Sequence, residues 1–268
     1  KDCLYALMLQ SANEVATALG EHIAGSTKKF AEMMNKRAKE AGALNTHFAN
    51  ANGLHDPNHY VTAYDMAMIT RAASKYSVFN DIVNTTTYTI KHNNKRKTDA
   101  TAIQRHKMVW PTSGYYYDGI IGGKTGFTDQ SGTTLVTYAK RNGMTLIAVV
   151  LHSNGTNVYK DTKELLDYGF NNFSRTAVKD LPSKITRHLL PAEKYILKDY
   201  KDDMLFETRR TASVSLPSGV DSNALEKTYS ITKNPAGLPL LTVTYTYNDH
   251  VVGSARYYQT RLLSDQLL

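Results

Sequence analysis

Lys124, Thr125 and Gly126 bring together three residue types that can hold a substrate along the edge of a β-sheet. A lysine ammonium attracts a carboxylate and polarises nearby hydroxyl groups, and a threonine hydroxyl can donate a hydrogen bond to the same carboxylate. A glycine lets the backbone of the substrate approach closely. The backbone N–H of the next residue, Phe127, is then available to a developing oxyanion. The run therefore predicts a strand edge that binds a substrate carboxylate.

Ser11 and Asn13 interrupt a helical apolar stretch and form a second candidate site. The helical pattern covers residues 3–9 and resumes over 14–19, so both side chains are expected at a turn between two helices. A hydroxyl there can pass on a proton, and an amide can both donate to and accept from a substrate amide. Each motif alone has an ordinary explanation. Ser11 or Asn13 can simply cap the second helix, and a Lys-Thr-Gly run often occurs by chance. Together they indicate an active-serine enzyme of acyl transfer.

The two motifs resemble the signature of the penicillin-binding proteins, and within them of the low-molecular-weight D-alanyl-D-alanine carboxypeptidases of the S11 type. That family carries Ser-x-x-Lys, Ser-x-Asn and Lys-Thr-Gly. This chain has the second motif at residues 11–13 and the third at 124–126. The resemblance covers about residues 1–173, and the further segments that look like the family are residues 2–9, 45–48, 52–54 and 60–65.

The nucleophile of that family is the serine of Ser-x-x-Lys, which precedes Ser-x-Asn by several tens of residues. Only ten residues precede Ser11. We therefore expect the nucleophile in an N-terminal segment absent from this chain, through truncation or because it belongs to another chain; an inactive relative is the alternative. Residues 26–29 also match Ser-x-x-Lys, but they follow Gly25, and Ser26 is better explained as the cap of the next helix.

The resemblance implies a serine-type carboxypeptidase that removes the terminal D-alanine from peptidoglycan stem peptides through an acyl-enzyme. It implies that Ser11 and Lys124 pass a proton to the departing D-alanine, that Asn13 holds the substrate amide, and that Thr125 binds the terminal carboxylate. The N–H groups of the nucleophile and of Phe127 would form the oxyanion hole. β-Lactam antibiotics are implied as inhibitors, and no cofactor is implied. A non-catalytic wall-binding relative and a β-lactamase stay open as alternatives.

Charge and cysteine content narrow the other classes of function. The 32 Lys and Arg residues against 24 Asp and Glu give a net charge of +8 and a pI near 9.3. Because these cations are scattered, apart from residues 95–97, and no nucleic-acid module accompanies them, we expect no nucleic-acid partner. A basic surface also suits anionic wall polymer or lipid headgroups, which makes a membrane surface a possible partner. The chain has a single cysteine, Cys3, so an internal disulfide is excluded. Cys3 is expected in the core.

The family resemblance also implies a location. Its members act outside the cytoplasmic membrane of bacteria, so we expect an enzyme of the cell wall or of the membrane surface, secreted and acting in wall maturation or sporulation. The histidines add no metal site to this interpretation. His55 and His59 are four residues apart, but Pro57 between them argues for a loop. His106 lies where the resemblance leads us to expect an asparagine, so its segment receives no site role.

The pattern of helices and strands expected around these residues predicts an α+β fold. This is a penicillin-binding/β-lactamase-like domain, in which helices lie on an antiparallel sheet. Helices are expected at residues 27–41, 63–75 and 157–173, with residues 165, 166 and 170 on the sheet. Asn142-Gly143 predicts a hairpin. From about Val178 short alternating strands predict a small β-sandwich, with an apolar face over residues 240–247. We therefore divide the chain into a partial D,D-peptidase domain, 1–176, and a C-terminal β-sandwich, 177–268.

Overall fold

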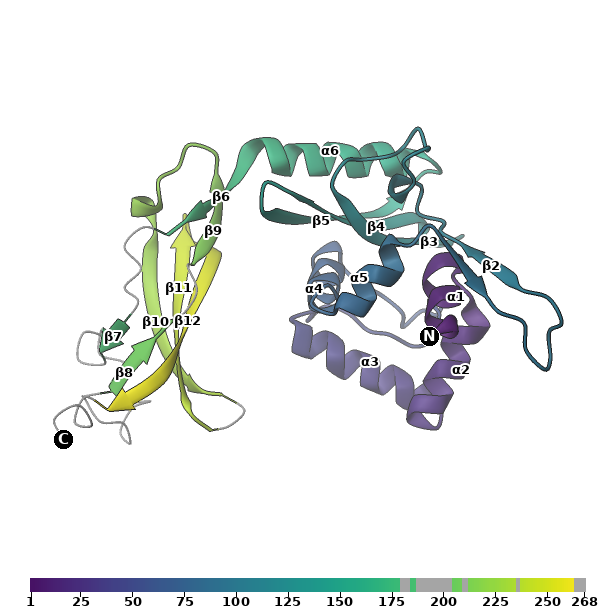
Figure 1. Ribbon diagram of the computed structural model, residues 1–268, viewed down its shortest axis with the longest axis horizontal. Helices are drawn as coiled ribbons and strands as arrows, with labels where there is room; N and C mark the ends of the chain where they lie inside the picture. Colours follow the sequence, from purple (N-terminus) through teal and green to yellow (C-terminus); the bar gives the residue numbers. More distant parts are fainter. Residues whose placement is uncertain (179–183, 187–203, 209–211, 235–236, 263–268) are drawn as a thin grey trace. The chain divides into compact units, whose positions relative to one another are not determined.

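The computed structural model describes residues 1–178, 184–186, 204–208, 212–234 and 237–262, which form two compact units, Lys1–Phe170 and Asn171–Leu268 (Figure 1). The first unit combines helices with an antiparallel sheet, which confirms the α+β class. The division into separate domains at 176/177 stays a prediction. In the described ranges, no helix has both the length and the apolar character needed to cross a membrane.

Five helices open the first unit, and their ends follow local capping rules. They are α1 (Asp2–Gln10), α2 (Asn13–Ala24), α3 (Thr27–Ala41), α4 (Ala63–Ala73) and α5 (Ser77–Asn84). Gly25 and Gly42 end α2 and α3 with φ of 79° and 95°, a left-handed conformation that costs glycine little. The Thr62 hydroxyl accepts a hydrogen bond from the Asp65 N–H and so caps α4. The helix predicted at 27–41 is confirmed, and the one at 63–75 ends two residues early.

Ser26 is the N-cap of α3, as the sequence predicts. Its Oγ accepts a hydrogen bond of 3.2 Å from the Lys29 N–H. We expect Ser26→Ala to lower the free energy of unfolding of this chain by about 1 kcal/mol, because one N–H of the first turn loses its acceptor. Urea unfolding measures this change. An unchanged free energy of unfolding would contradict the capping role of Ser26.

The sheet of the first unit carries the Lys-Thr-Gly run at its edge. Its strands β3 (Ile120–Thr128), β4 (Gly132–Arg141) and β5 (Met144–Ser153) are antiparallel and pair in that order. Asn142 and Gly143 join the last two with φ of 49° and 77°, which confirms the predicted hairpin turn. β3 is therefore an end strand of this sheet and pairs with β4 alone in the described ranges.

Helix α6 (Asn157–Asn172) packs on this sheet. Leu166 is 1% exposed and belongs to a core shared with β4 and β5, and Phe170 packs against the same core. The prediction for Leu165 is wrong, because it is 48% exposed. Neighbouring residues of a helix point about 100° apart, so the side chain next to Leu166 turns toward solvent.

Helix α1 is fixed against a two-stranded hairpin, β1 (Thr87–Ile90) and β2 (Ala100–Ile103). Tyr5 and Leu9, one turn apart, are buried together with side chains of α5 and β2. The Tyr5 ring also stacks on Tyr88 of β1 at 3.7 Å between centroids. The prediction that Cys3 is a core residue is wrong, because it lies off this face and is exposed. This packing holds the end of α1 in place.

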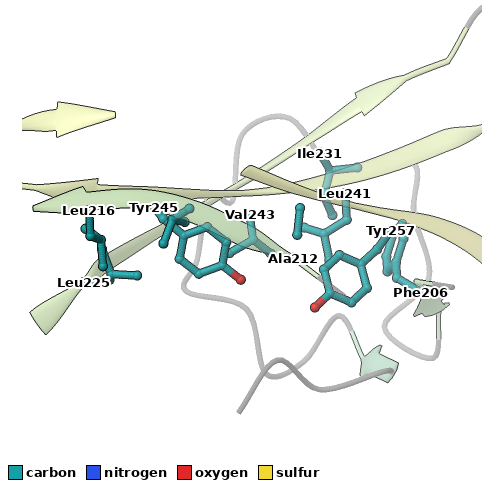
Figure 2. Close-up of a cluster of buried hydrophobic side chains, with 11 residues drawn as sticks. Phe206, Ala212, Leu216, Leu225, Ile231, Leu241, Val243, Tyr245 and Tyr257 are labelled. Atoms are coloured by element: carbon teal, nitrogen blue, oxygen red, sulfur yellow. The ribbon is translucent and has the colours of Figure 1, made fainter. Parts of the chain in front are cut away.

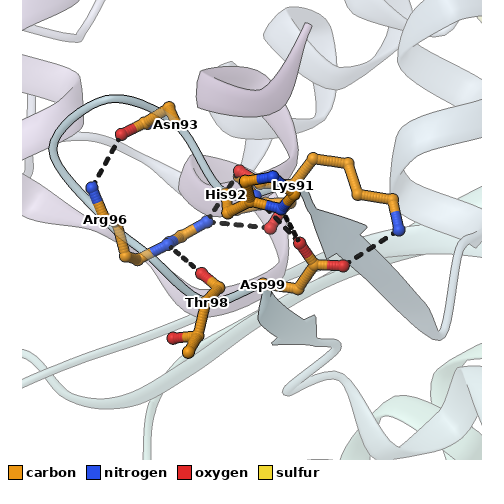
Figure 3. A network of polar contacts seen from close by, with 7 residues as sticks. Lys91, His92, Asn93, Arg96, Thr98 and Asp99 are labelled. Carbon is orange, nitrogen blue, oxygen red and sulfur yellow. Dashed lines mark hydrogen bonds and ion pairs between the residues drawn. The ribbon is translucent and has the colours of Figure 1, made fainter.

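The tip of this hairpin is closed by polar contacts (Figure 3). Asp99 accepts hydrogen bonds from the Lys91 ammonium at 2.9 Å and from the His92 N–H at 2.9 Å, and these hydrogen bonds lower its pKa to about 2. The Arg96 guanidinium donates to the carbonyls of Ile90, Lys91 and Thr98. One cation of the basic run 95–97 is therefore used to shape the turn.

The second unit consists of two antiparallel sheets that share one core. One sheet pairs in the order β10, β11, β12, β8, β7, and the other pairs β6 with β9. The described elements are β6 (Phe173–Ala177), β7 (Lys184–Thr186), β8 (Met204–Glu207), β9 (Ser213–Pro217), η3 (Ser222–Ala224), β10 (Glu226–Lys233), β11 (Pro239–Tyr247) and β12 (His250–Leu262).

The core of the second unit confirms the predicted alternation of β11. Leu241, Val243 and Tyr245 are buried, and Figure 2 shows them in one layer with Phe206 and Tyr257. The buried residues of this core are Phe206, Ala212, Val214, Leu216, Leu225, Ile231, Leu241, Val243, Tyr245, Ala255 and Tyr257. Since side chains from both sheets contribute, the unit has the construction of a small sandwich.

Candidate active site

Ser11 lies at the end of α1 in a conformation unusual for serine. Its φ of 57° and ψ of 46° are left-handed, and its N–H donates to the Leu7 carbonyl at 3.0 Å. This geometry ends α1, and α2 begins two residues later at Asn13. Ser11 therefore occupies the turn between two helices that the sequence predicts, and its side chain is half-buried.

Lys124, on the end strand β3 of the sheet, contacts this turn. Its ammonium donates a hydrogen bond to the Ser11 hydroxyl and a second one, of 2.8 Å, to the Thr125 carbonyl. The two contacting residues are 113 positions apart in the sequence. The fold thus brings the Ser-x-Asn and Lys-Thr-Gly motifs together.

The electrostatic environment of Lys124 makes its ammonium unusually acidic. Burial, and to a smaller extent the positive charge of Arg105, lower the pKa of Lys124 to about 8. No carboxylate forms an ion pair with Lys124 in the described part of the chain. A lysine with such a pKa can both give up and take back a proton near neutral pH.

The other predicted residues lie on β3 and at the start of α2. Thr125 and Gly126 lie on β3, half-buried, and Phe127 follows with 69% of its surface exposed. A Cβ added to Gly126 would lie 2.5 Å from the hydroxyl of Thr134, its partner on β4, so this position has no room for a side chain. Asn13, in the first turn of α2, is exposed, and its side chain has no recorded hydrogen bond to another described residue.

Sequence reasoning missed two residues of this site. Arg105 places a second cation near Lys124, and His106 is buried behind β3. They precede η1 (Lys107–Val109), and the Arg105 N–H donates to the Leu9 carbonyl at 3.2 Å, which connects this segment to α1. Neither residue belongs to a motif, so only the chain contacts reveal their proximity to Lys124.

The described side chains offer no cluster of three or more His, Cys, Asp or Glu residues that could hold a metal ion. Of His55 and His59, the pair weighed as the start of a zinc site, His59 makes a local contact. His59 accepts a hydrogen bond from the Ala49 N–H, and burial lowers its pKa.

Comparison with known proteins agrees with the motifs. The sequence model of the peptidase S11 family, described as D-alanyl-D-alanine carboxypeptidase, matches residues 1–155. The D-alanyl-D-alanine carboxypeptidase DacF of Bacillus subtilis is 27% identical over 238 residues, which are 87% of this chain and 57% of that protein. The chain spans about half of the length of the curated relatives that it matches.

Solved structures give the same result for the fold. The alignment with penicillin binding protein 5 of Haemophilus influenzae covers 97% of this chain and 73% of that one, with a TM-score of 0.67 and 26% identity. Penicillin-Binding Protein D2 of Listeria monocytogenes, in a cefotaxime-bound form, is 28% identical, with 63% of this chain and 65% of that chain covered and a TM-score of 0.55.

Proposed function

Since the chain belongs to the D-alanyl-D-alanine carboxypeptidase family of peptidase S11, we propose that it is part of a low-molecular-weight penicillin-binding enzyme that removes the terminal D-alanine from peptidoglycan stem peptides. The observation that carries the proposal is the contact between the Ser11 hydroxyl and the Lys124 ammonium. It joins two of the three family motifs in one site. A Ser-x-x-Lys segment that precedes this chain in the complete protein supplies the nucleophile.

Each site residue then has a role. The nucleophilic serine attacks the carbonyl carbon of the penultimate D-alanine, and its proton passes to the lysine of its own motif. As the C–N bond breaks, Lys124 and Ser11 deliver a proton to the nitrogen of the departing D-alanine. Asn13 holds the substrate amide. Thr125 binds the terminal carboxylate beside the ammonium, and Gly126 lets the substrate lie along β3.

The oxyanion of the tetrahedral intermediate is stabilised by two backbone N–H groups, that of the nucleophile and that of Phe127. The bond broken in this step releases D-alanine and leaves the stem peptide as an ester of the serine. Water then hydrolyses the ester and restores the hydroxyl. A β-lactam carries a reactive amide in the same position and acylates the same serine, so it acts as an inhibitor.

Arg105 adds long-range attraction for the substrate carboxylate. Together with Lys124 it gives this site two positive charges, and one of them is exposed. A carboxylate that ends the stem peptide is drawn toward such a site from solution. The exposed guanidinium of Arg105 attracts the substrate, and the partly buried ammonium of Lys124 transfers the proton.

The pH dependence of acylation should follow the pKa of Lys124. The proton donor is the ammonium form, so its population falls as pH rises through about 8. We expect the acylation rate of the complete enzyme to fall about tenfold per pH unit above this value. Stopped-flow measurements with a chromogenic β-lactam between pH 6 and 10 test this. An alkaline limb above pH 10 would contradict the role given to Lys124.

Labelling with a fluorescent penicillin tests the function itself. The complete protein, with its upstream segment restored, should form a covalent adduct that is released slowly. Absence of an adduct would favour a non-catalytic wall-binding relative, and rapid turnover would favour a β-lactamase. Release of D-alanine from a diacetylated Lys-D-Ala-D-Ala peptide then distinguishes carboxypeptidase activity from drug binding alone.

The substrate places the enzyme outside the cytoplasmic membrane, at the cell wall or at the membrane surface. The net charge of +8 favours contact with anionic wall polymers or lipid headgroups. The same reaction serves wall maturation or sporulation. Fractionation of cells that express the complete protein, with and without high salt, separates electrostatic attachment from free secretion.

A further inference from the structure

His106 is a buried histidine to which the proposed mechanism gives no role. Its side chain is 0% exposed, and its Nε2 lies 2.7 Å from the hydroxyl of Thr137, which is also 0% exposed. The His106 N–H donates to the Gln104 side chain at 3.2 Å, and that side chain donates to the Val83 carbonyl at 3.1 Å. The imidazole is therefore held in one place by β4 and by its own segment.

The imidazole packs directly against the backbone of Gly123. A Cβ added to Gly123 would lie 2.9 Å from both Cδ2 and Nε2 of His106. Thr137, the hydrogen-bond partner of His106, is also the residue of β4 that pairs with Gly123. The ring thus occupies the place that a side chain of residue 123 would take, one residue before Lys124.

The surroundings of His106 keep the imidazole neutral. Burial, and to a smaller extent the charge of Lys124, lower the pKa of His106 to about 4. The charged and titratable groups around it are Lys124 on β3, Arg105 and Lys107 beside it in sequence, and Tyr159 on α6, whose ring centroid is 6.5 Å away. From β4 it meets only the neutral hydroxyl of Thr137 among the contacts described.

We propose that His106 is a positioning residue for Lys124: by filling the space behind Gly123, it fixes where β3 places the Lys124 ammonium and keeps water away from that part of the strand. This inference rests on the proposed function, which makes the Lys124 ammonium a proton donor. It assigns no contact with substrate to His106. The neutral ring adds bulk without adding a third cation near the site.

The proposal predicts a change in the acidity of Lys124 when His106 is shortened. An asparagine leaves part of the space behind Gly123 to water. Water stabilises the charged form of the lysine, so the pKa of Lys124 should rise from about 8 toward its ordinary value. A residue that only contributed to stability would lower the melting temperature without moving this pKa.

The experiment compares His106→Asn with His22→Asn, the same change at an exposed histidine of α2. Trace acetylation of Lys124 with acetic anhydride between pH 6 and 11, read by mass spectrometry, gives the midpoint of the lysine in the present chain. We expect His106→Asn to raise this midpoint by about one pH unit and to slow β-lactam acylation of the complete protein about tenfold at pH 7. His22→Asn should change neither value.

An unchanged Lys124 midpoint in folded His106→Asn would overturn the inference, even if its melting temperature falls. Should that variant not fold, Thr137→Val keeps the shape and removes only the hydroxyl that holds Nε2; a smaller upward shift is then expected, and no shift overturns the inference. Because acetylation needs no acyl-enzyme, it gives an answer even if the complete wild-type protein fails to bind penicillin. That second failure would count against the proposed function alone.

Discussion

Lys124→Ala should lower the acylation rate of the complete enzyme by a factor of about 10²–10⁴, the range found when a positioned proton-transfer group is removed. The variant loses the proton donor and also the charge that attracts the substrate carboxylate. The hydroxyl of Ser11 loses its hydrogen-bond partner at the same time. We therefore expect both the binding and the chemical step to weaken.

Stability should not follow activity in this variant. Lys124 is partly buried, and no carboxylate pairs with it in the described part of the chain, so its ammonium is held at a cost in solvation. Removing it is expected to leave the free energy of unfolding unchanged or higher. Second-order rate constants for a fluorescent penicillin and urea unfolding measure the two effects, with Lys28→Ala at an exposed position of α3 as the control. Labelling at the rate of Lys28→Ala would remove Lys124 from the mechanism.

The sequence predicts several elements of the fold well, because each depends on short-range rules. The cap at Ser26, the hairpin at Asn142-Gly143 and the alternation of Leu241, Val243 and Tyr245 follow from side-chain hydrogen bonding, positive φ and the period of a strand. Such features need only a few neighbouring residues. For this reason the sequence pattern alone predicts them correctly.

The predictions that failed depend on which side of a helix meets the core. Cys3 and Leu165 are apolar and lie within helical patterns, yet both are exposed. In each case a neighbour in sequence, Tyr5 or Leu166, takes the buried position. The sequence gives the period of a helix more securely than its rotation, because rotation is decided by the partner surface.

The electrostatic environment of Lys124 could not be predicted from the sequence, for a different reason. The pKa of Lys124 depends on burial by distant segments and on Arg105, which is close in space but belongs to no motif. His106 was set aside because it stands where an asparagine is expected, and its contact with Gly123 depends on the pairing of β3 with β4. Contacts of this kind follow from the assembled fold and have no local signature.

Gly123→Ala is expected to have the second large effect, on stability and activity together. A Cβ at this position would lie 2.0 Å from the Val136 carbonyl oxygen and 2.9 Å from the His106 ring. The first of these atoms is backbone and cannot rotate away, so β3 must separate from β4. We expect a loss of about 1–3 kcal/mol in the free energy of unfolding, as for other overpacked sites.

The same displacement moves Lys124, the next residue of the strand, away from the Ser11 hydroxyl. A shift of about 1 Å in a catalytic group lowers rates about 10²-fold, so acylation of the complete protein by a fluorescent penicillin should fall by that order even where the variant is fully folded. Gly114→Ala is the matched control, since an added Cβ there meets no atom within 4 Å and the backbone φ is not positive. If Gly123→Ala were as stable and as quickly acylated as Gly114→Ala, β3 would have room behind it, and neither the strand edge nor the imidazole packed on it would set the position of the ammonium.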